Sequence, residues 1–202
     1  TTPETSTMTA PVDSTAPSAR EELHHRQINL RFYRRADGLY DIEGRLVDTK
    51  SHPFRRQLTP EDTPPGVPIH DITVRLVIDE ALLVHHAQAW MAATPFVVCG
   101  GAAQTLAPLR GLRIGKGWNS QVRALLGGAA SCTHIMELLG PMATTAFQGL
   151  APQRIAEVNQ PGNEMQRQAK VDSCYAYGAQ REVVAQLWPH LHRPAPTDKE
   201  PS

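Results

Sequence analysis

The segment from His70 to Ile78 constrains the fold more than any other part of this sequence. Along HDITVRLVI, the apolar residues share one parity with the first histidine, and the positions between them are mostly polar. Because side chains of a β-strand alternate between its two faces, this pattern predicts a strand with one buried face. Such a strand requires partner strands beside it and an apolar layer over its buried face.

Three further segments are expected to be antiparallel strands of the same sheet. They are 28–32, 40–46 and 82–91. The first two alternate in polarity and flank Asp37-Gly38, a hairpin signal, and the third is predicted to pair with the central strand. The proline-rich stretch 53–68 has no periodicity and is expected to be a loop.

The second half of the chain has helical rather than strand periodicity. Helical segments are predicted at 102–109, 119–126, 131–148 and 179–187. Because strands come first and helices afterwards, we expect an α+β fold with an antiparallel sheet of three to five strands. The C-terminal helices are expected to cover one face of this sheet.

Composition separates the expected domain from its tails. Residues 1–21 and 193–202 are rich in small and polar residues and in proline, so both tails are predicted to be disordered. The remaining residues, 22–192, are expected to form a single domain, which suits a chain of 202 residues.

Charge and hydropathy exclude two classes of partner. The 20 Lys and Arg residues equal the 20 Asp and Glu residues in number, which argues against a nucleic-acid binder. The sequence contains neither an apolar run long enough to span a membrane nor a secretory signal, so a cytoplasmic protein is expected. The expected partners are a small-molecule substrate and either a second copy of the chain or a partner enzyme.

Five side chains at predicted junctions between elements form a candidate metal-ligand pool. They are His70, Asp71, Cys99, Cys132 and His134. Three widely spaced cysteines do not indicate a disulfide framework, and Cys132 at a helix start is expected to have a lowered pKa. Thiols, imidazoles and a carboxylate are ligand types for Zn²⁺ or iron. Cys174 is expected to pack under the last helix, and His24-His25 to lie on the surface.

Residues 68–150 resemble the iron–sulfur scaffold fold of the IscU/NifU type. That family presents a ligand loop, a Cys-Gly segment opening a helix and a His-Cys pair at the start of a long helix. Segments 68–71, 98–102 and 132–138 stand in the corresponding places. The N-terminal hairpin, 22–50, has no counterpart in the scaffold family.

This chain departs from the scaffold pattern at two of the three motifs. His70 replaces the first cysteine, and Cys132-Thr133-His134 replaces His-Cys. With two thiols in place of three, a mononuclear zinc or iron site is easier to reconcile with the sequence than a labile cluster.

Four segments together resemble the bacterial DUF2889 family. They are YRRADGLYDIEGRLVDTK (33–50), PIHD (68–71), CTHIMELL (132–139) and VDSCYAY (171–177). The resemblance implies that Glu43, Arg45 and Asp48 in the hairpin belong to the functional part. It also implies a role in bacterial catabolism of aromatic or acyl compounds.

The leading hypothesis is a metal-dependent enzyme with lyase-type or hydrolase-type chemistry on a small molecule. In it, Glu43 or Asp71 acts as general base, Arg45 orients an anionic group and His134 takes part in catalysis.

Two alternatives stay open from the sequence. One is a metal-free lyase, hydratase or isomerase, in which His134 activates Cys132 or Cys99 and His70-Asp71 is the acid–base pair. The other is a non-catalytic subunit that binds a partner enzyme through the hairpin. Whether Cys174, Asp48, Asp172 and Tyr175 join the site is also open.

Overall fold

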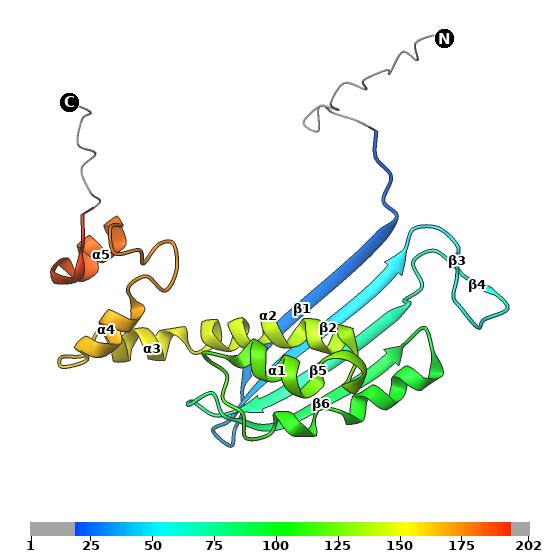
Figure 1. The fold of residues 1–202 in the computed structure, drawn as a ribbon, viewed down its shortest axis with the longest axis horizontal. Helices are drawn as coiled ribbons and strands as arrows, with labels where there is room; N and C mark the ends of the chain where they lie inside the picture. Colours follow the sequence, from blue (N-terminus) through cyan, green and yellow to red (C-terminus); the bar gives the residue numbers. More distant parts are fainter. Residues whose placement is uncertain (1–18, 195–202) are drawn as a thin grey trace, which may run out of the picture.

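Four long strands form one antiparallel sheet in the order β1-β2-β5-β6 (Figure 1). The computed structural model describes residues 19–194, so most of the two predicted tails lies outside the described residues. The strands are β1 (His24–Arg34), β2 (Tyr40–Lys50), β5 (His70–Ile78) and β6 (Val84–Ala93).

The two faces of the sheet differ in burial, as the alternation in β5 predicts. Ile42 and Leu46 of β2 and Ile72 of β5 are fully buried on one face. The residues between them, such as Glu43 and Arg75, lie on the other face and are partly exposed. The polarity pattern therefore identifies the core face of both strands correctly.

The proline-rich stretch is not a loop throughout. It contains a small hairpin of β3 (Phe54–Arg55) and β4 (Asp62–Thr63). Strands of two residues are too short to produce a periodic pattern, so the sequence contains no signal that would reveal them.

Helical segments cover the apolar face of the sheet (Figure 1). They are η1 (Val97–Gln104), η2 (Ala107–Leu109), α1 (Trp118–Leu126), η3 (Gly128–Ala130) and α2 (Thr133–Gly149). The helix α2 packs against β1, β2 and β5, while η1 and η2 pack against β6. The predicted α+β class, with an antiparallel sheet and several helices, is confirmed.

The helix α2 packs closely on β1 and β2, and two glycines leave room for it. A Cβ atom at Gly44 of β2 would lie 3.1 Å from the Met142 side chain, and one at Gly149 would lie 2.2 Å from the Phe32 ring. A backbone approach this close fixes the height of α2 above the sheet. The N-terminal turn of α2 lies near the C-terminal end of β2, where His134 approaches Asp48.

The chain continues beyond α2 through short helices that lie past the end of the sheet (Figure 1). These are α3 (Ala151–Val158), α4 (Glu164–Lys170), α5 (Glu182–Leu187) and η4 (Pro189–Leu191). The sequence predicted a helix at 179–187 but neither α3 nor α4. No residue of α3 or α4 is buried, and both helices are shorter than the stretch over which helical periodicity can be recognised.

Candidate functional site

A row of three polar residues crosses the apolar face of the sheet at one end. In the strand register, Arg26 of β1 pairs with Asp48 of β2, and Asp48 pairs with His70 of β5. All three side chains share the helix-covered face because they lie opposite one another on adjacent strands. Asp48 is 1% exposed, which is unusual for a carboxylate.

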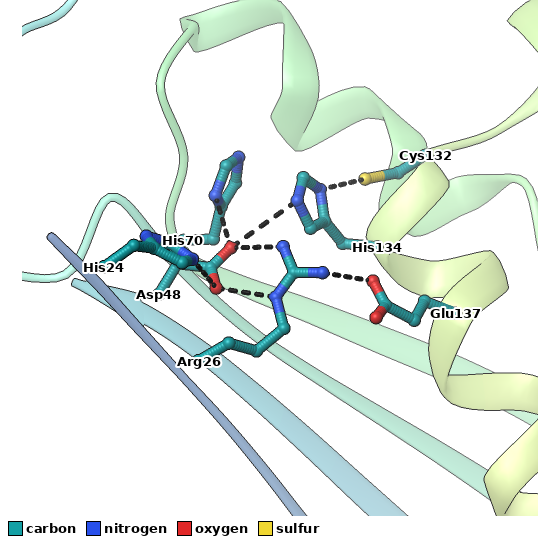
Figure 2. Close-up of polar contacts among 7 residues, drawn as sticks. All are labelled: His24, Arg26, Asp48, His70, Cys132, His134 and Glu137. Carbon is teal, nitrogen blue, oxygen red and sulfur yellow. Dashed lines mark hydrogen bonds and ion pairs between the residues drawn. The ribbon is translucent and has the colours of Figure 1, made fainter. Parts of the chain in front are cut away.

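Both oxygens of the Asp48 carboxylate accept hydrogen bonds (Figure 2). The guanidinium of Arg26 donates to Oδ1 and to Oδ2, each over 2.7 Å. His24 Nε2 lies 3.2 Å from Oδ1, and His70 Nδ1 lies 3.0 Å from Oδ2. A buried carboxylate needs such partners, because an unpaired buried charge is strongly destabilising.

The N-terminal turn of α2 completes the cluster from above (Figure 2). His134 Nε2 lies 3.6 Å from Asp48 Oδ2, and the opposite ring nitrogen, Nδ1, lies 3.6 Å from Cys132 Sγ. One turn further along α2, Glu137 accepts a 2.5 Å hydrogen bond from Arg26. His24, Arg26, Asp48, His70, Cys132, His134 and Glu137 together form what we call the Asp48 cluster.

Within this cluster, three donors are close enough to share one metal ion. One ligand atom each from Asp48, His70 and His134 lies within 4.8 Å of the others. The rings of His70 and His134 are 3.8 Å apart between centroids. Two rings this close can both direct a nitrogen toward one ion, and the neutral imidazole is the form that binds metals.

The surroundings hold Asp48 ionised and His70 neutral. Burial by itself raises the pKa of Asp48, but the hydrogen bonds and charge of Arg26, helped by His24 and His70, lower that pKa below its ordinary value. Burial lowers the pKa of His70 and outweighs the opposite effect of Asp48. Both shifts favour the protonation states that a metal ligand requires.

A family model for the protein of unknown function DUF2889 matches residues 24–148, more than half of the chain. The chain belongs to the DUF2889 family. The match begins at His24 and ends within α2, so it contains every residue of the Asp48 cluster in this DUF2889 protein and excludes α3 to α5. No curated protein and no solved structure matches the chain. Among the described residues, none of the helices has both the length and the apolar character needed to cross a membrane.

The sheet separates three of the predicted site residues from the cluster. Asp71 follows His70 in β5 and therefore points to the opposite face, where it forms an ion pair of 2.7 Å with Arg45. Glu43, also on that face, pairs with Arg75. The expectation that Asp71 joins His70 as a ligand, with Glu43 or Arg45 nearby, is corrected by this alternation.

The cysteines have three different environments in the DUF2889 protein. Cys132 is the N-cap residue of α2 and contacts His134, but through the ring nitrogen that faces away from Asp48. Cys99 lies in η1 and lines a groove that also borders His70, Cys132 and His134, without belonging to the group of potential ligands that lie within 4.8 Å of one another. Cys174 is exposed, so the expectation that it packs under the last helix was wrong.

Sequence reasoning missed two members of the cluster and assigned a third to the surface. Arg26 and Glu137 were not singled out, and His24, although 38% exposed, contacts Asp48 instead of being an isolated surface residue. The sequence alone does not decide whether Asp48 belongs to the site. The available signal was parity: His24 and Arg26 share it with the apolar residues of β1, as Asp48 does with those of β2.

The Cys132 thiol is expected to react at lower pH than a free thiol. Burial raises its pKa, but the hydrogen bond with His134 and the backbone amides of Ile135 and His134 lower it below the ordinary value. A lowered pKa places the rise of the thiolate fraction at lower pH. Alkylation of Cys132 by iodoacetamide, followed by mass spectrometry in metal-free buffer, measures that rise.

The matched variant for this experiment is His134→Asn, which removes the ring from the thiol. In this variant the reactivity profile should move to higher pH, toward that of N-acetylcysteine. Burial can slow the reaction without moving its pH midpoint, so the midpoint is the quantity to compare. A wild-type midpoint equal to that of N-acetylcysteine would contradict the prediction.

Proposed function

We propose that Asp48, His70 and His134 bind one divalent transition-metal ion and that this metal centre is the working site of the protein. The observation that carries the proposal is the convergence of three donor atoms within 4.8 Å. Ligands bonded at about 2.0 to 2.1 Å in tetrahedral geometry lie roughly 3.3 Å apart. The distances from Asp48 Oδ2 to the two histidines, 3.0 and 3.6 Å, bracket that value.

The charge of the cluster supports a cation. The two carboxylates, Asp48 and Glu137, outnumber the one guanidinium, Arg26, so these three side chains together carry one net negative charge. Arg26 and His24 donate to Asp48 from outside the proposed ligand set, as groups around a ligating carboxylate commonly do.

Cys132 has a positioning role in this proposal. Its sulfur lies beside Nδ1 of His134, so it can accept the ring N–H and leave the Nε2 lone pair directed toward Asp48 Oδ2. A second hydrogen bond of this kind selects the tautomer of a ligating histidine. Cys132 thus contributes to the site without being a ligand.

Two histidines and one carboxylate are a ligand set that suits Zn²⁺ or Fe²⁺ and leaves positions for water or substrate. Such a metal polarises a substrate carbonyl or lowers the pKa of bound water. We therefore favour hydrolase-type or lyase-type chemistry on a small molecule. A mononuclear centre also agrees with the presence of a single cysteine, Cys132, in the Asp48 cluster, because an iron–sulfur cluster needs several thiolate ligands. The relation to the IscU/NifU architecture stays a prediction.

Two observations favour a second candidate function, a metal-free enzyme. Arg26 already bonds both oxygens of Asp48, and Cys132 and His134 are in contact. In that case His134 would activate Cys132 as a nucleophile, and His70, held by Asp48, would be the acid–base group.

Metal titration of the purified chain separates the two candidates. After removal of bound metal with a chelator, isothermal titration with Zn²⁺ and with Fe²⁺ under anaerobic conditions should give one site per chain for at least one of the two ions. Zinc binding should also raise the unfolding temperature, because a ligand that binds only the folded state stabilises it. Absence of both binding and stabilisation would reject the metal centre in favour of the metal-free enzyme.

A further inference from the structure

A groove adjoins the Asp48 cluster, and Arg26 is not among the residues that line it. Its volume is about 690 Å³, within the range of sites that hold one small organic molecule. His70, Cys132 and His134 border it, so a molecule in the groove would lie against the proposed metal centre.

The rest of the groove wall is predominantly apolar. Met91, Pro95, Phe96, Val98 and Ala102 contribute to it, together with alanines of η3. No residue that lines it is an Asp, Glu, Lys or Arg.

Two hydroxyl groups at the wall satisfy each other. Thr105 Oγ1 donates to the carbonyl of Ala102 over 2.8 Å, and it lies 2.6 Å from Ser131 Oγ, which donates to it. They therefore do not require a polar partner from a ligand. The groove thus joins a polar end to a hydrocarbon wall.

Charge at the polar end selects the head group of the ligand. A divalent ion exceeds the one net negative charge of Arg26, Asp48 and Glu137 by one positive charge. That charge is partly desolvated, because His70 and His134 are only 18% and 19% exposed. An anion that reaches an open position on the metal would balance the charge.

We propose that the groove binds a monocarboxylate with an apolar body, with the carboxylate at the metal centre and the hydrocarbon along Phe96 and Val98. This inference rests on the proposed metal centre and adds the substrate class. Because the groove wall is apolar, the affinity for the carboxylate should increase with the length of its hydrocarbon chain. Each buried methylene group should raise this affinity about fourfold.

The test uses the zinc-loaded full-length chain and a series of probes: butanoate, hexanoate and octanoate. Isothermal titration below the micellar range of octanoate should show tighter binding with each increase in length. Octanoate should be bound at least about tenfold tighter than butanoate.

Two adjacent valines of η1 provide a matched pair of variants. Val98 lines the groove and is 81% exposed, whereas Val97 is 100% exposed and does not line it. Because both are exposed, aspartate at either position should leave folding intact. Val98→Asp should weaken octanoate binding by at least about tenfold, and Val97→Asp should change it by less than about twofold.

The outcomes distinguish this inference from the metal centre on which it rests. Failure of both Zn²⁺ and Fe²⁺ to bind the wild-type chain rejects the metal centre and, with it, a metal-anchored carboxylate. Zinc binding without any dependence on chain length overturns the groove assignment and leaves the metal centre intact. Equal weakening by Val97→Asp and Val98→Asp also overturns it, because it would indicate non-specific attraction to an apolar surface.

Discussion

Replacing Asp48 with asparagine is expected to lower the affinity of the protein for Zn²⁺ by at least about 100-fold. Asparagine keeps the size of the side chain but removes the only anionic donor of the proposed ligand set. Loss of an outer-shell partner alone costs a metal site roughly 10- to 100-fold, and loss of a ligand should cost at least as much. Competition with a chromophoric zinc chelator measures the change.

Asp71→Asn is the matched control for this experiment. It is the same substitution, one residue from His70, but Asp71 lies on the opposite face of the sheet in its ion pair with Arg45. Zinc affinity should therefore stay within about twofold of the wild-type value. A comparable loss of affinity in both variants would mean that the two carboxylates do not differ in role, contrary to the proposal.

The ion pair between Asp71 and Arg45 is expected to make the stability of the fold depend on pH. The hydrogen bond from Arg45 lowers the pKa of Asp71, so the folded state favours the ionised form. The stability contributed by this pair is present above the ordinary pKa of an aspartate and is lost as the pH falls through the lowered value. The difference in the free energy of unfolding between Asp71→Asn and the wild-type chain should therefore be largest near neutral pH and vanish in strong acid. Zinc affinity at neutral pH should not change.

Replacing Ile135 with alanine is expected to destabilise the fold by about 2 to 5 kcal/mol. Ile135 is fully buried and follows His134 directly in α2, so it anchors the turn that presents His134 and Glu137 to the sheet. Truncation removes buried apolar surface and leaves a cavity below that turn. Urea unfolding of the metal-free chain, followed by circular dichroism, gives the change in the free energy of unfolding.

An exposed isoleucine supplies the control for this substitution. Ile155 in α3 is 51% exposed, and its replacement by alanine should change the free energy of unfolding by less than about 0.5 kcal/mol. If Ile135→Ala were as mild as Ile155→Ala, the first turn of α2 would not be anchored as described. The cluster would then lack a rigid upper half.

Local sequence patterns were sufficient for most of the fold. Alternation assigned β2 and β5 and their buried faces, and the apolar stripe assigned α2 with a start only two residues from the observed one. Helical and strand periods are properties of a few neighbouring residues, so the sequence expresses them directly. The sequence did not reveal α3 and α4, because both are too short for their periodicity to be recognised.

Local sequence patterns could identify only some residues of the candidate site. His70, Cys132 and His134 were selected by residue type and by their positions at the starts of elements. Asp71 was selected for the same reason, but the strand period of two turns it away from His70.

What the sequence by itself determined is which residues face the core within β2, β5 and α2. What only the tertiary structure decided is that Arg26, Asp48 and His70 stand opposite one another, with His134 above them. The physical reason is that the facing of a side chain depends on local backbone geometry. Strand register and helix docking depend instead on how the whole hydrophobic core packs, across separations of 22 residues between neighbours in the row and of more than 60 residues to α2.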